Sequence, residues 1–197
     1  GQAVAKWNNY VLFIKDAVPG DVVDVKLIRR KRNYAEAEVI NYVKLSDKRT
    51  NPVFEHFGVC GGCKWQHIDY EHQRSLKLRL ITESFMKAQI PCPVETINGA
   101  PEAFYYRNRM DYVFGPKGEL GLKEPERWWS ILDLKTCFLL SPESVEVMSK
   151  VREWARATGL PFWDGKTHQG FFRYLVIREG KNTSERMVTI VTGDPTE

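Results

Sequence analysis

The chain has 197 residues, of which 43% are hydrophobic and 12% aromatic, enough to bury one large core or two small ones, so a disordered tail is excluded. It contains no apolar run long enough to cross a membrane, and residues 1–6 lack the layout of a secretory signal, so we expect a soluble, cytoplasmic protein with no membrane partner. The formal net charge of +4 is too small by itself to identify a polyanionic partner.

The first 50 residues combine short strands with the whole basic surplus of the chain. Residues 1–50 hold 10 basic and 6 acidic side chains, whereas residues 51–197 hold 19 of each. Residues 10–14 are apolar, and residues 21–28 and 35–43 alternate apolar and polar side chains; together with the turn between the first two segments, this pattern predicts a small OB-type β-barrel. Arg29, Arg30 and Arg32 lie in the densest basic stretch, where a solvated loop and a phosphate-binding surface are both open interpretations.

A loop-like segment follows and contains Cys60-Gly61-Gly62-Cys63. Four cysteines are too few and too unevenly spaced for a disulfide scaffold in a chain of this length. Two thiolates two residues apart can hold iron or zinc, and a zinc site of Cys60, Cys63, His56 and His67 is one alternative. Thiol-disulfide exchange at the same pair is another.

Two helices and further strands are predicted downstream. Asp69 can cap a helix that carries Leu78, Ile81 and Phe85 on one stripe and ends before Pro91. Residues 105–114 return to strand alternation, which would put Tyr105, Arg107 and Arg109 on one face. The spacing also predicts strands over 120–123 and 128–134, a helix from Ser141, and a hairpin of 171–178 with 186–192. We expect four tryptophans to lie in the core: Trp128, Trp129, Trp154 and Trp163.

Three segments resemble one family in the same order along the chain. Residues 57–63 (FGVCGGC), followed by 65–67 (WQH), resemble the iron-sulfur loop of RNA uracil-5-methyltransferases of the RumA/TrmA type. Residues 133–137 (DLKTC), followed by 141–143 (SPE), are similar to the region of that family with a distant cysteine ligand. The first 50 residues are similar to its TRAM module, especially 18–21 (VPGD) and 34–39 (YAEAEV).

The resemblance implies a 4Fe-4S cluster with Cys60, Cys63 and Cys137 as metal ligands. In the family three cysteines spaced C-x5-C-x2-C and one distant cysteine hold the cluster, but Phe54 occupies the position of the first ligand here. We therefore expect the cluster to be incomplete, labile or absent. Cys92 could substitute as a ligand, although a plain buried thiol is its expected role.

The resemblance also implies that RNA recognition and methyl transfer lie on different domains. Family members transfer a methyl group from S-adenosylmethionine to uracil C5 after addition of a cysteine thiolate to C6, on a Rossmann-like domain. The chain has no glycine-rich nucleotide fingerprint, so we assign no catalytic or cofactor-binding residue. The sequence thus predicts the N-terminal RNA-recognition part of such an enzyme, inactive alone, with S-adenosylmethionine on a missing domain and 23S rRNA as the favoured target.

The predicted fold class is β-rich α+β. We expect a TRAM-like OB barrel over 1–50, a mixed α+β central domain with the cysteine loop over 51–69 and 104–197, and a helical segment over 70–103 that packs on the missing catalytic domain. Arg107 and Arg109 join Arg29, Arg30 and Arg32 as RNA-binding candidates because the corresponding strand of the family faces its substrate. No obligate protein partner is inferred; the rival function is a stand-alone RNA-binding or zinc-binding accessory protein.

Overall fold

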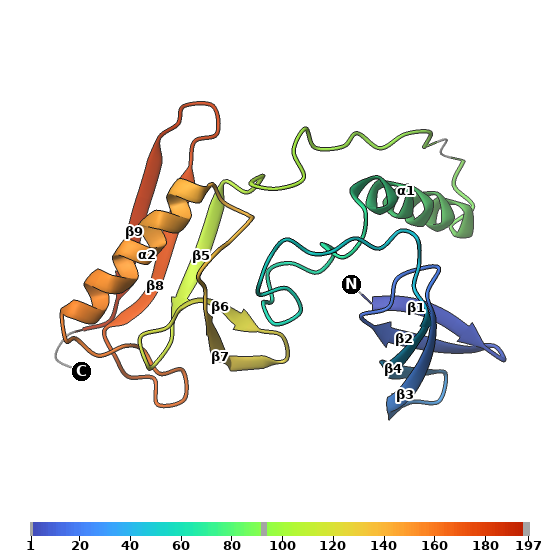
Figure 1. The fold of residues 1–197 in the computed structure, drawn as a ribbon, viewed down its shortest axis with the longest axis horizontal. Helices are drawn as coiled ribbons and strands as arrows, with labels where there is room; N and C mark the ends of the chain where they lie inside the picture. Colours follow the sequence, from blue (N-terminus) through green and yellow to red (C-terminus); the bar gives the residue numbers. More distant parts are fainter. Residues whose placement is uncertain (1, 92–93, 195–197) are drawn as a thin grey trace. The chain divides into compact units, whose positions relative to one another are not determined.

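The computed structural model describes residues 2–91 and 94–194 and has a β-rich α+β fold with two sheets and two helices (Figure 1). The chain divides into two compact units, each built from two segments. Residues 1–52 and 64–99 form unit 1, and residues 53–63 and 100–197 form unit 2. No helix in the described ranges has the length and apolarity of a membrane-spanning segment.

Unit 1 contains a four-stranded sheet with the order β1-β2-β4-β3. Its strands are β1 (Gln2–Trp7), β2 (Tyr10–Lys15), β3 (Val22–Arg30) and β4 (Tyr34–Lys44). β2 runs parallel to β4, and the other two pairs are antiparallel. Within the described residues no ladder joins the edge strands β1 and β3, so the strands are confirmed but a closed OB barrel is not.

Unit 1 also contains helix α1 (Tyr70–Lys87). As predicted, Asp69 caps it, accepting a hydrogen bond from the His72 amide at 3.0 Å. Leu76 is buried and packs with Val18 and Ile68. Of the predicted apolar stripe, Leu78 and Phe85 are half-buried and Ile81 is exposed.

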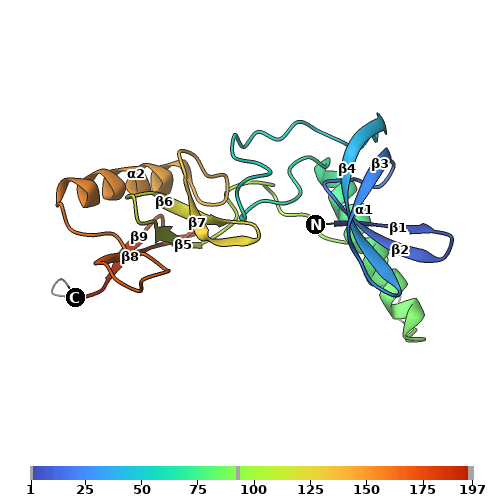
Figure 2. The same cartoon turned by 90° about the horizontal axis from the view of Figure 1, so that it is seen from below.

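Unit 2 contains a five-stranded antiparallel sheet with the order β7-β6-β5-β8-β9. Helix α2 (Pro142–Ala157) lies along one face of this sheet (Figure 2). Met148 and Ala155 of α2 are fully buried in the core of the unit. The strands are β5 (Arg109–Phe114), β6 (Leu120–Glu124), β7 (Arg127–Asp133), β8 (Phe172–Glu179) and β9 (Arg186–Thr192).

Two predictions for this unit are wrong. The strand predicted over 105–114 begins only at Arg109. Tyr105 has a φ of 56°, and the amides of Tyr105 and Arg107 donate to the carbonyls of Phe138 and Leu139, which hold this segment outside the ladder. Three of the tryptophans predicted to be in the core, Trp128, Trp129 and Trp154, are 56%, 48% and 52% exposed.

Candidate nucleic-acid interface and cysteine cluster

The basic residues of unit 1 gather where β3 turns into β4. Arg29 and Arg30 end β3, and Arg32 lies in the turn, which the Lys31 amide closes by donating to the Tyr34 carbonyl at 2.8 Å. All three arginines are exposed. Arg29 is 3.8 Å from Glu36, a loose ion pair between partly exposed side chains. The structure therefore places the three candidates together on one exposed tip.

Beside this tip, β1, β2, β3, the segment 17–21 and Arg79 of α1 line a groove with a volume of about 1050 Å³. Apolar side chains of β1, β2 and β3 line it, including Leu12 and Leu27. Arg30 and the exposed Trp7 also line this groove. The groove therefore combines an apolar wall with a cation and an aromatic ring.

Arg107 and Arg109, the two candidates in unit 2, do not share a strand. Arg107 precedes β5 and donates to the Met110 sulfur at 3.3 Å. Arg109 opens β5 and binds both carboxylate oxygens of Asp111, at 2.8 and 3.0 Å. Arg109 is therefore paired with a nearby carboxylate, although both side chains of the pair remain 49% exposed.

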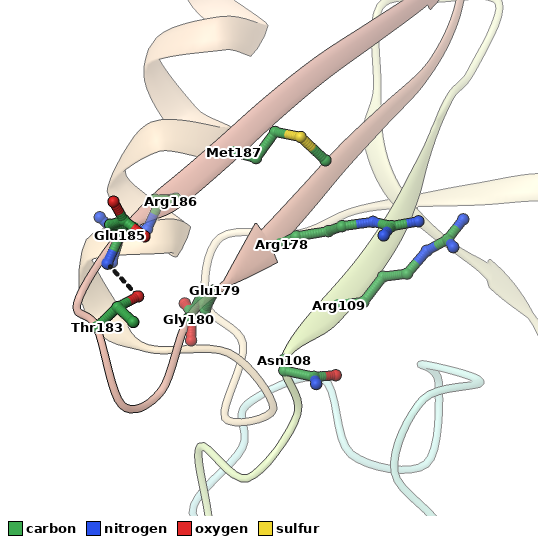
Figure 3. Close-up of a pocket in the computed structure, with 9 residues that line it drawn as sticks. All are labelled: Asn108, Arg109, Arg178, Glu179, Gly180, Thr183, Glu185, Arg186 and Met187. Atoms are coloured by element: carbon green, nitrogen blue, oxygen red, sulfur yellow. Dashed lines mark hydrogen bonds between the residues drawn. The ribbon is translucent and has the colours of Figure 1, made fainter.

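A pocket of about 600 Å³ opens at the start of β5 and the end of β8. Figure 3 shows Arg109 and Arg178 extending from adjacent strands in the same direction, with the hairpin between β8 and β9 on the other side of the pocket. Arg109 and Arg178 are direct cross-strand partners. Among the described residues, no hydrogen bond or ion pair engages the Arg178 guanidinium.

Glu179 anchors the wall of this pocket. The buried carboxylate accepts hydrogen bonds from the Ser141 amide at 3.0 Å and the Ser141 hydroxyl at 2.7 Å, and it pairs with Lys181. Burial alone would raise the pKa of Glu179, but the hydrogen bonds from Lys181, Ser144 and Ser141 outweigh it and lower that pKa from 4.5 to about 2. Glu179 is therefore ionised and fixes the start of α2 to the end of β8.

The three cysteines predicted as metal ligands lie in one region of the unit 2 core. Cys60 and Cys137 are buried, and the half-buried Cys63 packs against the same cluster. Burial raises the pKa of the Cys60 thiol, although the Gly62 amide donates to its sulfur at 3.4 Å. Cys92 lies outside the described residues.

The described residues do not fit a complete 4Fe-4S ligand set. No three His, Cys, Asp or Glu side chains in residues 2–91 and 94–194 form a group that could hold a metal ion, which also leaves the zinc alternative without support. Phe54, at the position of the first family ligand, is 3% exposed and packs edge-on against Phe138 with ring centroids 6.1 Å apart. The residue six positions before Cys60 is thus an apolar ring, which cannot bind iron.

The thiol oxidoreductase alternative is also contradicted. It predicts a Cys60 thiol with a low pKa at the N-terminus of a helix. Cys60 instead follows a series of turns, is 4% exposed, and has a raised pKa.

Sequence reasoning missed Arg178. The sequence predicted a strand over 171–178 that ends at this residue, but nothing local indicated its partner. The neighbouring strand, β5, lies about 65 residues earlier in the chain, and only the observed register brings Arg109 opposite Arg178.

Comparisons with known proteins support one enzyme family. The model of the TRAM domain family matches residues 1–40. The chain is 40% identical, over 89% of its length, to an uncharacterized RNA methyltransferase of Nanoarchaeum equitans, of which it covers 38%. It is 32% identical, over 92% of its length, to the tRNA (uracil(54)-C(5))-methyltransferase of Pyrococcus abyssi, of which it covers 43%.

A solved structure is also similar. It is the crystal structure of the Pyrococcus abyssi tRNA (uracil-54, C5)-methyltransferase in complex with S-adenosyl-L-homocysteine. The match has a TM-score of 0.68 and 28% sequence identity. It covers 99% of this chain and 48% of the methyltransferase chain in that crystal structure. The chain thus spans about half the length, or less, of the proteins that it matches.

These matches correct the predicted function. The sequence predicted an RNA-recognition part that is inactive alone and directed at 23S rRNA. The TRAM match ends at residue 40, yet similarity to RNA methyltransferases extends over 89% to 99% of the chain. The names of the Pyrococcus abyssi relative and of the solved structure give tRNA, not rRNA, as the substrate. Together, the comparisons place a TRAM domain at the N-terminus of the chain and support its kinship with the RNA uracil-C5-methyltransferases.

Proposed function

We propose that this chain functions in the S-adenosylmethionine-dependent methylation of uracil C5 in RNA, with tRNA as the favoured substrate class. The observation that carries the proposal is the match of 99% of the chain to a tRNA (uracil-54, C5)-methyltransferase solved with S-adenosyl-L-homocysteine. Binding of that product by the related enzyme supports S-adenosylmethionine as the methyl donor.

We further propose that residues 1–50 form an RNA-binding module of OB type. The TRAM match over residues 1–40 and the exposed tip of Arg29, Arg30 and Arg32 support this role. Arginine forks bind phosphate oxygens, and a groove that adds an aromatic side chain, here Trp7, suits an unpaired strand.

The second RNA surface that we propose lies on residues 51–69 and 104–197, with Arg107 and Arg109 as its first contacts. Arg109 is half-exposed, and its ion pair with Asp111 is accessible to water, so a phosphate can compete with that carboxylate. Arg107 keeps an exposed side chain, and its hydrogen bond to the Met110 sulfur engages only a weak acceptor, which a phosphate oxygen can replace.

Salt-dependent binding of a uridine-rich single-stranded RNA to the 197-residue chain tests these surfaces. Each of Arg30→Ala, Arg107→Ala and Arg109→Ala is expected to weaken binding and to reduce the slope of log K against log salt by about 0.7, the value for one phosphate contact on a single strand. Lys150→Ala is the matched control, because Lys150 is an exposed cation on α2 that pairs with Glu146 at 2.7 Å. Unchanged affinity in all three arginine variants would remove the proposed surfaces.

The proposed activity is tested separately with the protein at its natural length. Incubation with labelled S-adenosylmethionine and a tRNA transcript should yield 5-methyluridine on nucleoside analysis. Absence of that product over a range of tRNA and rRNA transcripts would refute the proposed reaction without bearing on RNA binding.

For the cysteine cluster, we propose that Cys60, Cys63 and Cys137 do not hold a complete, stable 4Fe-4S cluster in this chain. Support comes from the buried ring of Phe54, which occupies the position of the first family ligand and cannot bind iron. We derive no catalytic step from this cluster.

A further inference from the structure

The face of the unit 2 sheet that points away from its core is rich in cationic, aromatic and apolar side chains. On β5 and β8 the buried residues, such as Tyr112 and Leu175, alternate with exposed ones. We call the exposed side of β5, β8 and β9 the open face. α2 lies against the opposite side, where Met148 and Ala155 join the core.

One row across the open face holds two arginines and a methionine. Arg109 on β5 pairs with Arg178 on β8, and Arg178 pairs with Met187 on β9. All three side chains line the pocket of about 600 Å³, and Figure 3 shows the two guanidinium groups reaching out over the same side of the strands. Direct cross-strand partners have Cβ atoms about 5 Å apart, so both forks can reach one small anion.

The charges in this row are unbalanced. Like charges directly opposite each other on adjacent strands destabilise a sheet. Asp111 offsets only Arg109, because no hydrogen bond or ion pair to Arg178 exists among the described residues. The acidic side chain next to Arg178 in the chain, Glu179, points into the core and is bound by Ser141 and Lys181. An anion placed between the two guanidinium groups would remove the repulsion.

The other arginine of the pocket, Arg186, is already engaged. Its guanidinium donates to the hydroxyl groups of Ser144 at 2.6 Å and Ser141 at 3.1 Å. It therefore belongs to the structural anchor at the start of α2, and the cations that face the pocket are Arg178 and Arg109, the latter in its half-exposed pair with Asp111.

An aromatic ring continues the open face. Tyr174 lies four residues before Arg178 on β8, about 13 Å away at the rise of a strand, and it is 37% exposed. Its cross-strand partner on β9, Val191, is 38% exposed and provides an apolar neighbour. A ring beside a pair of arginine forks on an open sheet suits a single RNA strand, with a phosphate on the forks and a base on the ring.

We propose that Arg178 and Arg109 form a clamp for one backbone phosphate of a single-stranded RNA that crosses the open face, with Tyr174 stacking on a nearby base. The proposal rests on the proposed RNA-binding function and extends it to two residues, Arg178 and Tyr174, that neither the sequence pattern nor the comparisons assign.

The test is a titration of the 197-residue chain with uridine-rich single-stranded RNA between about 50 and 200 mM salt. Arg178→Ala is expected to weaken RNA binding and to lower the slope of log K against log salt by about 0.7. Arg178→Lys should keep that slope, because the charge is retained. It should lose part of the affinity, because an ammonium cannot bind phosphate with two parallel hydrogen bonds. Tyr174→Leu should weaken binding without changing the slope, since stacking releases no counterions.

Arg127→Ala is the matched control. Arg127 is an exposed arginine of the same sheet, on β7, with a loose ion pair to Glu124 at 3.8 Å, and its removal should leave both affinity and slope unchanged. Because Arg178 is exposed, the variants should unfold at the wild-type urea concentration, which a parallel denaturation checks.

Each outcome separates the two proposals. If the wild-type chain binds RNA and Arg178→Ala binds with the same affinity and slope, the clamp is refuted while the proposed RNA binding stands. If Arg178→Ala and Arg127→Ala lower the slope equally, the effect is general charge and the clamp is refuted. If the wild-type chain binds no RNA, RNA binding by this chain and the clamp both fail.

Discussion

Replacement of Glu179 by glutamine would test how the end of β8 is fixed to the start of α2. The carboxylate accepts from the Ser141 amide and hydroxyl and pairs with Lys181. Glutamine keeps the shape but removes the charge and turns one acceptor oxygen into an NH2 donor that faces other donors. Lowering a carboxyl pKa from 4.5 to about 2 corresponds to about 3 kcal/mol of folding free energy. We expect Glu179→Gln to lose about 2–3 kcal/mol at neutral pH.

The assay is urea unfolding followed by tryptophan fluorescence, since four of the six tryptophans, at positions 128, 129, 154 and 163, belong to unit 2. The folded pKa of Glu179 lies below its unfolded value, so its contribution is fully present above about pH 4.5 and is lost as the pH falls toward 2. The stability difference between wild type and Glu179→Gln should therefore narrow over that window.

A matched control is Glu185→Gln, an exposed carboxyl on the same hairpin, which should unfold as wild type does. Equal urea midpoints for wild type and Glu179→Gln at neutral pH would refute the anchor. A difference that stays constant between pH 5 and pH 2 would show that the lost stability does not come from the carboxylate charge.

Two further predictions concern packing and metal content. Gly121→Ala should destabilise unit 2 by about 1–3 kcal/mol or more, because the new Cβ would lie 2.0 Å from the Leu132 carbonyl oxygen on β7. Gly165→Ala, whose Cβ would meet its nearest atom at 3.5 Å, is the control, and equal thermal midpoints for both variants would contradict the expectation. Anaerobic reconstitution followed by iron and sulfide analysis should give fewer than four irons per chain, and a stable content of four would show that another group replaces the ligand missing at Phe54.

Features that depend on neighbouring residues could be predicted from the sequence. Asp69 and Ser141 both cap helices as predicted, since a short polar side chain before an apolar stripe satisfies the free amides of the first turn. The hairpin of β8 and β9 was also predicted, because alternating strands flank a turn around Gly180.

Features that depend on contacts far apart in the sequence could not be predicted. The start of β5 at Arg109 is set by hydrogen bonds from Tyr105 and Arg107 to a segment about 30 residues later. Trp154 lies on a helix whose apolar spacing predicts burial, yet it covers the edge of Phe172 with its ring half exposed. The sequence placed Phe54 at the position of the first family ligand, but it did not reveal that the ring belongs to the apolar core of unit 2.

The division of each unit into two chain segments affects how the protein folds during synthesis and how it can be cleaved into parts. The polypeptide passes from one unit to the other after residues 52, 63 and 99. During synthesis the loop of residues 53–63 leaves the ribosome long before Leu122 and Leu139, which pack around Gly62, have been translated. At about 5–20 residues per second this loop waits several seconds for its partners. A cut at any single position between residues 53 and 99 would split at least one unit, so no single cut releases both units intact.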